Sequence, residues 1–273
     1  MLNFLVGADP EIFMTRSGKL VSAHGAVSGT KYAPLPVDGG AVQVDGMALE
    51  FNVNPTNNAD KFVGNINLVM SQLKSMLPDD ADFLIEPTAM FGHKLIRAQP
   101  AEAKELGCEP DFNAYTREEN PRPNADAPFR TASGHIHIGW MGDKDKFMSL
   151  QHQEECIFLV KVLDHTLGLA SLVWDKDEKR RELYGNFGAF RYKPYGVEYR
   201  TLSNKWLASE AHIRCVFAIV EYVMKHIGSK ISLQRLGEQD HAPTSFEKQY
   251  VMHTLQHRLP ENIIDMIKGL ENV

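Results

Sequence analysis

The sequence predicts an α+β fold built on an antiparallel sheet. Apolar and polar residues alternate with a period of two in the first half, most clearly over 41–53, as in half-buried strands. The second half holds two long segments with helical spacing, 144–168 and 207–227. Because no internal repeat or low-complexity linker divides the chain, residues 1–273 are expected to form a single catalytic domain, with 207–273 as its helical C-terminal part.

The first strands carry unusual polar and turn-forming residues. Apolar stretches at 2–6 and 11–14 predict one interrupted strand or two short ones, because Gly7, Asp9 and Pro10 stand between them. The alternation over 41–53 predicts a strand pair with Asp45-Gly46 as its turn.

The other elements follow from apolar spacing and from proline positions. In chain order we expect a strand at 19–23, a Gly/Pro-rich loop at 25–40, a helix at 58–77 ended by Pro78, a strand at 82–91, a long functional loop or lid at 107–130, strands at 132–140, 186–192 and 196–202, and two helical stretches in 244–271 separated at Pro260.

The composition is that of a globular protein. The 273 residues are 43% hydrophobic and 23% charged, which is enough to bury a sizeable core. The net charge of -6 does not favour nucleic acid as a partner. Three cysteines without a disulfide or zinc spacing indicate a reducing compartment. No segment reads as a signal peptide or a membrane span, so we expect a cytoplasmic protein, in the host cytoplasm if it is encoded by a phage.

Carboxylates recur on the predicted strands. Glu11 follows Asp9 after two residues, and strand alternation sends Glu50, Asn52 and Asn54 to one face. Such groups can bind a hard cation through oxygen, although a strand edge with solvated acids would look the same. The sequence leaves both interpretations open for each segment taken alone.

The stretch Ser133–Gly139 places two imidazoles on one strand. His135 and His137 share a face, while the two intervening isoleucines fill the other side. This arrangement suits contact with a metal or a polyphosphate, and the flanking glycines allow a ligand to approach closely. A pair of surface histidines on an edge strand is the alternative.

Basic residues gather between 179 and 200. Arg191 interrupts a strand-like stretch between aromatic residues, so we expect it to bind an anion. Lys179 and Arg180 follow three acids and are expected to be a solvated charge run. Glu198 and Arg200 alternate with apolar residues, offering a carboxylate for a metal and a guanidinium for phosphate on one face, or else a structural ion pair.

These segments are more specific together than singly. Glutamates on three strands, the His-x-His pair on a fourth and Arg200 beyond the last predict one polar sheet face. Such a face cannot pack as core, because buried charges need partners, and Mg²⁺ and ATP phosphates would supply them.

The order of these motifs resembles a known family. GADPEIF, VDGMALEFNVNP, GCEPDFNAY, SGHIHIGW and the stretch from Arg180 to Trp206 are similar to the phage-type COOH-NH2 ligase-like (amidoligase) family, remote kin of glutamine synthetase and glutamate–cysteine ligase. The resemblance extends from Gly7 to about Trp206. It implies a glutamine-synthetase-like curved antiparallel sheet with helices packed on its outer face.

The resemblance also implies roles for individual residues. Metal ligands would be Glu11, Glu50, His135 and Glu198; ATP-binding residues would be His135, His137, Arg181, Arg191 and Arg200; catalytic residues would be Arg200, Glu50 and Arg191. Asp9 and Asp45 are possible additional metal ligands, and Asp111 and Asn113 are assigned to substrate recognition.

The implied activity is ATP-dependent amide formation through an acyl phosphate. ATP with Mg²⁺, or Mn²⁺ in its place, would be the cofactors, and small-molecule or peptide carboxylates and amines the substrates. The sequence does not give their identity or the oligomeric state. The alternatives are a guanidino phosphotransferase of the same fold, a non-catalytic phage-associated binding protein, and a metal-dependent hydrolase using the two histidines, which lacks a third ligand at the usual spacing.

Overall fold

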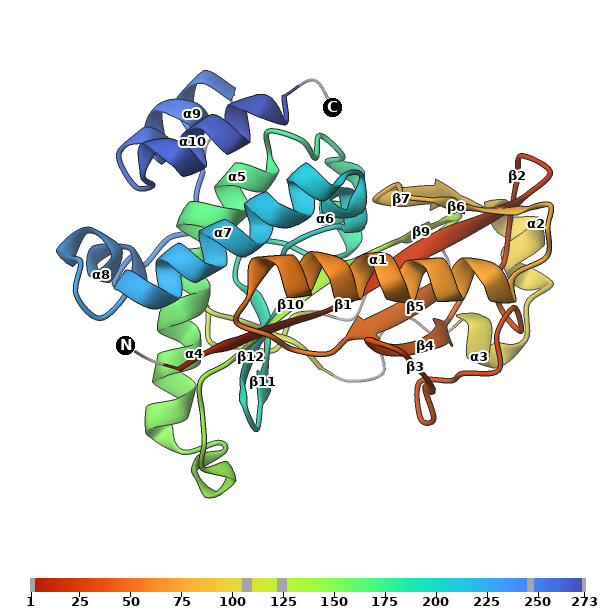
Figure 1. Ribbon diagram of the computed structural model, residues 1–273, viewed down its shortest axis with the longest axis horizontal. Helices are drawn as coiled ribbons and strands as arrows, with labels where there is room; N and C mark the ends of the chain where they lie inside the picture. The colour runs from red at the N-terminus through yellow and green to blue at the C-terminus, as the bar shows by residue number, and fades with distance from the viewer. Residues whose placement is uncertain (1–2, 105–109, 122–126, 245–247, 272–273) are drawn as a thin grey trace.

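The computed structural model describes residues 3–104, 110–121, 127–244 and 248–271 (Figure 1). Within these ranges ten strands form one sheet, and every ladder between its strands is antiparallel. Eight follow one path: β3 (Leu35–Val37), β4 (Gly40–Asp45), β5 (Ala48–Val53), β1 (Leu5–Arg16), β10 (Gly134–Gly139), β12 (Gly196–Tyr199), β11 (Ala189–Lys193) and β8 (Phe112–Asn113). The predicted α+β fold with a large antiparallel sheet is confirmed.

The long strand β1 is the centre of the sheet. Its first half pairs with β10, and its second half pairs with β5, β2 (Lys19–Val21) and β6 (Ala81–Leu84). A small separate sheet joins β7 (Thr88–Met90) to β9 (Phe129–Thr131). The strand expected at 82–91 is therefore two short strands in different sheets.

Pro10 does not interrupt β1. The amide of Glu11 donates to Ser133 on the β10 side, and the amide of Val6 donates to Thr56 on the other. Alternation thus directs the missing N–H of Pro10 to the β5 side, where pairing begins only at Glu11. One continuous strand therefore carries both Asp9 and Glu11.

The β4–β5 hairpin turns one residue later than the sequence predicts. Asp45 still pairs with Ala48, so the two loop residues are Gly46 and Met47. Gly46 has a φ of 58°, which glycine adopts without strain. Asp45 is therefore the last residue of β4, and it lies near Glu50.

Helices cover one face of the sheet. The helices α1 (Ala59–Met76) and α7 (Glu210–His226) lie side by side in Figure 1, with α1 packed on β4 and β5. Asn58 caps α1 by accepting from the Lys61 amide at 2.8 Å. The helix α4 (Leu150–Leu163) packs on β11 and β12 and continues through a π-helical turn, Asp164–Gly168. These helices bury the apolar side chains of the strands and leave the other sheet face to polar residues.

Shorter elements complete the chain. They are α2 (Gly92–Arg97), α3 (Ala101–Lys104), α5 (Leu169–Ser171), α6 (Lys179–Leu183), α8 (Ile231–Gly237), α9 (Lys248–Gln256), α10 (Glu261–Gly269) and the 3-10 turns Lys144–Lys146 and Asn204–Leu207. The sequence predicts the two tail helices but misses α6 and α8, which are only one to two turns long. Among the described residues, the helices are too short or too polar to cross a bilayer.

Candidate active site

The strand register brings the predicted polar residues onto one face of the sheet. Glu11 pairs with Glu50, and Glu50 pairs with Gln43 on the next strand. On the other side of β1, Asp9 pairs with His135. Directly opposed residues of antiparallel strands point to the same face, so these side chains form a continuous surface.

A second cross-strand row extends this surface. His137 of β10 pairs with Glu198 of β12, which pairs with Arg191 of β11. Ile136 and Ile138, on the opposite face of β10, are fully buried under the helices. His135 and His137 therefore share one face of β10, as the alternation predicts.

This polar surface forms a cavity of about 290 Å³. Its walls carry acidic, basic and apolar side chains. The charged and histidine residues include Asp9, Glu11, Asp45, Glu50, His135, Arg191, Lys193, Glu198 and Arg200, and the apolar and aromatic residues include Phe13, Met47, Phe129, Leu183 and Tyr184. An adjoining groove of about 490 Å³ shares Asp9, Lys31, Gln43 and Glu50 with the cavity and is lined by Gly7, Asn52, Pro34, Pro55, His137 and Tyr195.

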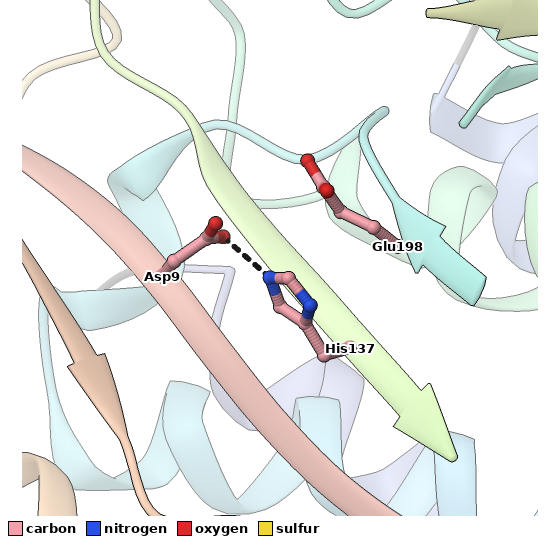
Figure 2. A group of neighbouring side chains, drawn as sticks. All are labelled: Asp9, His137 and Glu198. Atoms are coloured by element: carbon pink, nitrogen blue, oxygen red, sulfur yellow. Dashed lines mark ion pairs between the residues drawn. The ribbon is translucent and has the colours of Figure 1, made fainter. Parts of the chain in front are cut away.

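Three side chains in this surface converge closely enough to hold a metal ion. Asp9, His137 and Glu198 come from β1, β10 and β12, and each offers a ligand atom within 4.8 Å of the other two (Figure 2). Asp9 Oδ1 lies 3.0 Å from His137 Nε2. Both of these atoms are buried, and so is Glu198 Oε2. Ligand atoms of two carboxylates and one imidazole that converge in this way fit a shared cation.

Arg200 sits at the junction of several charged groups. It is 3% exposed, and its guanidinium forms an ion pair with Glu198. Its Nε also donates to Asp111 Oδ2 at 3.3 Å, and Nη1 lies 3.3 Å from His135 Nδ1. Burial lowers the pKa of Arg200, and Asp111 opposes that shift, so the cation is held in place by its acidic neighbours.

Two more cations approach Glu198 from β11. Arg191 Nη1 lies 3.3 Å from Glu198 Oε1, and Lys193 Nζ lies 2.8 Å from Oε2. Glu198 is 1% exposed, so this carboxylate is buried among three cations. Arginine and lysine side chains gathered in this way suit an anionic ligand.

The opposite side of the cavity is acidic. Burial raises the pKa of Glu11 to about 7, helped by the nearby negative charge of Asp45, although Glu11 accepts the Ser133 amide at 2.7 Å. Burial also raises the pKa of Glu50 well above its ordinary range, with Asp9 and Asp45 adding to it. Carboxylates crowded in this way fit either a bound cation or a proton acceptor.

The two histidines differ in protonation. Burial and the charge of Arg200 lower the pKa of His135 to about 4, so its ring is neutral at pH 7. Burial also acts to lower the pKa of His137, but attraction to Asp9 outweighs it and the net shift is upward. Burial alone would raise the pKa of Asp9, yet attraction to His137 and His135 lowers it well below its usual range.

The adjacent residues Arg180 and Arg181 lie differently from the prediction. Arg180 is 1% exposed and donates to the carbonyls of Thr201 and Leu202, both at 2.8 Å, so the expected solvated charge run is wrong for this residue. Lys179 is exposed, as expected. Arg181 does not line the cavity, since its guanidinium points to the Asp177 carbonyl at 3.2 Å and to Asp175.

Sequence reasoning underrated several residues of the surface. Asp9 was only a possible extra ligand, although it stands two residues before Glu11 on the same strand face. Lys193 and Tyr184 both stand in the basic segment between 179 and 200, but the sequence gives neither a role of its own.

The predicted loop 107–130 is partly described. Its residues 107–109 and 122–126 lie outside the described residues, so the predicted lid stays a prediction there. Asp111 contacts Arg200 in the cavity wall. The Asn113 side chain instead accepts the Tyr115 amide and donates to Phe187, which are contacts within the fold.

A comparison with known protein families identifies the family of the chain. The family described as "Phage phiEco32-like COOH.NH2 ligase-type 2" matches residues 128–268, slightly more than half of the chain. The match includes β10, β11 and β12 and runs well past Trp206 into the C-terminal helices, while β1 and β5 lie before it. No protein of curated function matches the chain.

A solved structure shares the fold. The crystal structure of a bifunctional glutathione synthetase from Pasteurella multocida is similar over 99% of this chain, with a TM-score of 0.50 and 12% identity. The chain covers 47% of that protein, so it spans about half of its length. At this identity the likeness shows the fold alone. The family match confirms the resemblance seen in the motifs, and the chain belongs to the phage phiEco32-like COOH.NH2 ligase-type 2 family.

Proposed function

We propose that this protein is an ATP-dependent carboxylate–amine ligase that forms an amide through an acyl-phosphate intermediate. The observation that carries the proposal is the charge division of one cavity, with Arg191, Lys193 and Arg200 on one side and Glu11 and Glu50 on the other. Membership of a family named for joining carboxyl and amino groups supports it. The substrates are small-molecule or peptide carboxylates and amines.

The chemistry explains why both sides are needed. A free carboxylate does not react with an amine at a useful rate, because oxide is a very poor leaving group. Transfer of the γ-phosphoryl group of ATP to the carboxylate turns that oxygen into phosphate, which the amine can displace. The cationic side stabilises the transferred group, and the acidic side receives the amine and its proton.

Asp9, His137 and Glu198 fit a divalent cation. Carboxylate oxygens with one imidazole nitrogen suit Mg²⁺ and, still better, Mn²⁺. We propose that these residues hold one ion and that Glu11 and Glu50 contribute to a further ion beside them. A bound ion would neutralise charge on the phosphate oxygens. The convergence of Asp9, His137 and Glu198, whose ligand atoms all lie within 4.8 Å of one another, supports this assignment.

The cations of the site are positioned for phosphate. Arg200 and Arg191 are both ion-paired to Glu198, so their guanidinium groups are oriented before any ligand arrives. His135 is neutral and its buried Nε2 has no partner among the described residues, so it can contact a phosphate-bound ion. The groove beyond His137, with Tyr195 and two prolines in its walls, is the proposed place of the nucleoside.

Glu50 is the proposed proton acceptor for the amine. Its carboxylate lines the acidic side of the cavity, next to Glu11 on the neighbouring strand and away from the cations that would hold the phosphoryl group. We also propose that residues 1–273 act as one catalytic unit. The larger of two hydrophobic clusters includes both Phe4 and Leu270, which supports this because the C-terminal helices pack on the same interior as the sheet.

The test is ATP consumption by the pure protein with Mg²⁺, against a mixed panel of amino acids, peptides and amines, with mass spectrometry of the products. ADP together with a product lighter by one water than its two substrates is the expected result. ADP with a phosphorylated guanidino product would instead show a phosphotransferase. No ADP on any panel, and no binding of Mg-ATP, would leave a non-catalytic binding protein.

A further inference from the structure

Tyr184 occupies a position in the cavity that no motif assigns. It follows α6 directly, and its ring lies over the Arg200 guanidinium, 4.8 Å from its centroid to Cζ. The same ring is 6.1 Å from the His135 ring, centroid to centroid. An aromatic face at this distance attracts a cation, so the ring helps to hold Arg200 in one orientation.

The hydroxyl group of Tyr184 is left without a hydrogen bond in the part of the chain that the structure describes. Its oxygen is also buried. Buried phenol groups are normally hydrogen-bonded, because leaving one unpaired costs free energy. Tyr184 lines the cavity. A ligand in that cavity is therefore the natural partner for its O–H.

Arg180 of α6 lies next to Tyr184, with its Cζ 6.0 Å from the centre of the Tyr184 ring. The Tyr184 amide donates to the Arg180 carbonyl at 2.8 Å, while the Arg180 guanidinium donates to the carbonyls of Thr201 and Leu202. Gly185 leaves room for this guanidinium, since an added Cβ would lie 2.0 Å from Nη1. The aromatic ring and Arg200 are thus tied to the same end of β12.

We propose that Tyr184 contacts the phosphoryl group in transfer: its O–H donates to an anionic oxygen that Arg200 also holds. The inference rests on the proposed ligase function and adds a residue to its machinery. Arg200 brings the positive charge, and Tyr184, whose ring lies against Arg200, adds a buried hydrogen-bond donor beside it.

The test compares two probes, Mg-ATP and Mg-ADP with aluminium fluoride, which imitates the transferred phosphoryl group. Tyr184→Phe keeps the ring over Arg200 and removes only the O–H. It should bind Mg-ATP within about twofold of the wild-type protein and bind the fluoride complex about 10-fold more weakly, as for one hydrogen bond to a charged group. Tyr250→Phe, the same change at an exposed position of α9, should alter neither affinity.

Tyr184→Leu removes the ring as well and should weaken the fluoride complex further than Phe does. Equal binding of the fluoride complex by the wild-type protein and Tyr184→Phe would overturn the assignment while leaving the ligase intact. A wild-type protein that binds neither Mg-ATP nor the fluoride complex would overturn the ligase proposal and, with it, this inference.

Discussion

Asp9 Oδ1 and His137 Nε2 lie 3.0 Å apart and form a buried ion pair. The two residues belong to neighbouring strands, and Glu198 reaches the same point from a third. Side chains from three strands thus converge on one point, with their ligand atoms all within 4.8 Å of one another. A divalent cation at that point would bind all three side chains.

Loss of one carboxylate should therefore weaken metal binding. Asp9→Asn is expected to raise the dissociation constant for Mn²⁺ by about 10- to 100-fold, because it removes a negative charge from the ligand set. Electron paramagnetic resonance of free Mn²⁺ during a titration measures this dissociation constant. Asp265→Asn, an exposed acid on α10, is the control. Unchanged affinity in Asp9→Asn would remove this residue from the metal site.

We expect the turnover number of the enzyme to depend strongly on Glu198 and Arg200. Glu198→Ala or Arg200→Ala should each lower it by about 100-fold or more, the usual effect of removing one group that stabilises transition-state charge. Circular dichroism should show the fold intact, and Arg214→Ala on the exposed side of α7 should retain normal activity. Near-normal turnover in both site variants would refute their assignment.

Arg180 should matter for stability rather than as a surface charge. Arg180→Met leaves the Thr201 and Leu202 carbonyls without their donor, and each such hydrogen bond from a charged group contributes about 1.5–3 kcal/mol. We expect the free energy of unfolding in urea to fall by about 3 kcal/mol or more. In Lys179→Met, which loses only an exposed contact over the Phe129 ring, the fall should stay below about 1 kcal/mol. Equal losses would contradict the buried role.

Asp164 should make stability depend on pH. Burial raises its pKa from 3.8 to about 7, against the hydrogen bond from Tyr199 at 2.7 Å. Above about pH 4 the unfolded chain has lost the Asp164 proton, whereas the folded protein keeps this proton up to about pH 7. Its contribution to stability is present at acid pH and is lost as the pH rises through about 7.

Urea unfolding of the wild-type protein and Asp164→Asn between pH 5 and 8 checks this expectation. The asparagine variant cannot ionise, so its free energy of unfolding should fall less steeply over this range. Parallel pH profiles for the two proteins would show that Asp164 does not titrate as expected.

Short-range patterns explain how much of the site was predictable. Alternation with a period of two places His135 with His137, and Glu198 with Arg200, on one face wherever a strand forms, and the register then aligns them with Asp9 and Arg191. The fold class follows from the same alternation together with the helical spacing of the second half.

Long-range contacts explain what was missed. Arg180 follows three acids, which suggested a solvated charge, but its partners are backbone carbonyls about twenty residues later. Arg181 is its neighbour on the one-turn helix α6 and therefore points another way. Pro10 suggests a break in β1 from the sequence alone. The strand continues because the missing N–H of Pro10 points to the β5 side, where β5 does not yet pair with β1.

The most direct test of the central claim uses a carboxylate substrate labelled with ¹⁸O, once the panel has identified one. Activation through an acyl phosphate predicts that one labelled oxygen appears in the inorganic phosphate that is released with the amide. Amide formation with unlabelled phosphate would contradict the account, because the carboxylate oxygen would then not have received the phosphoryl group.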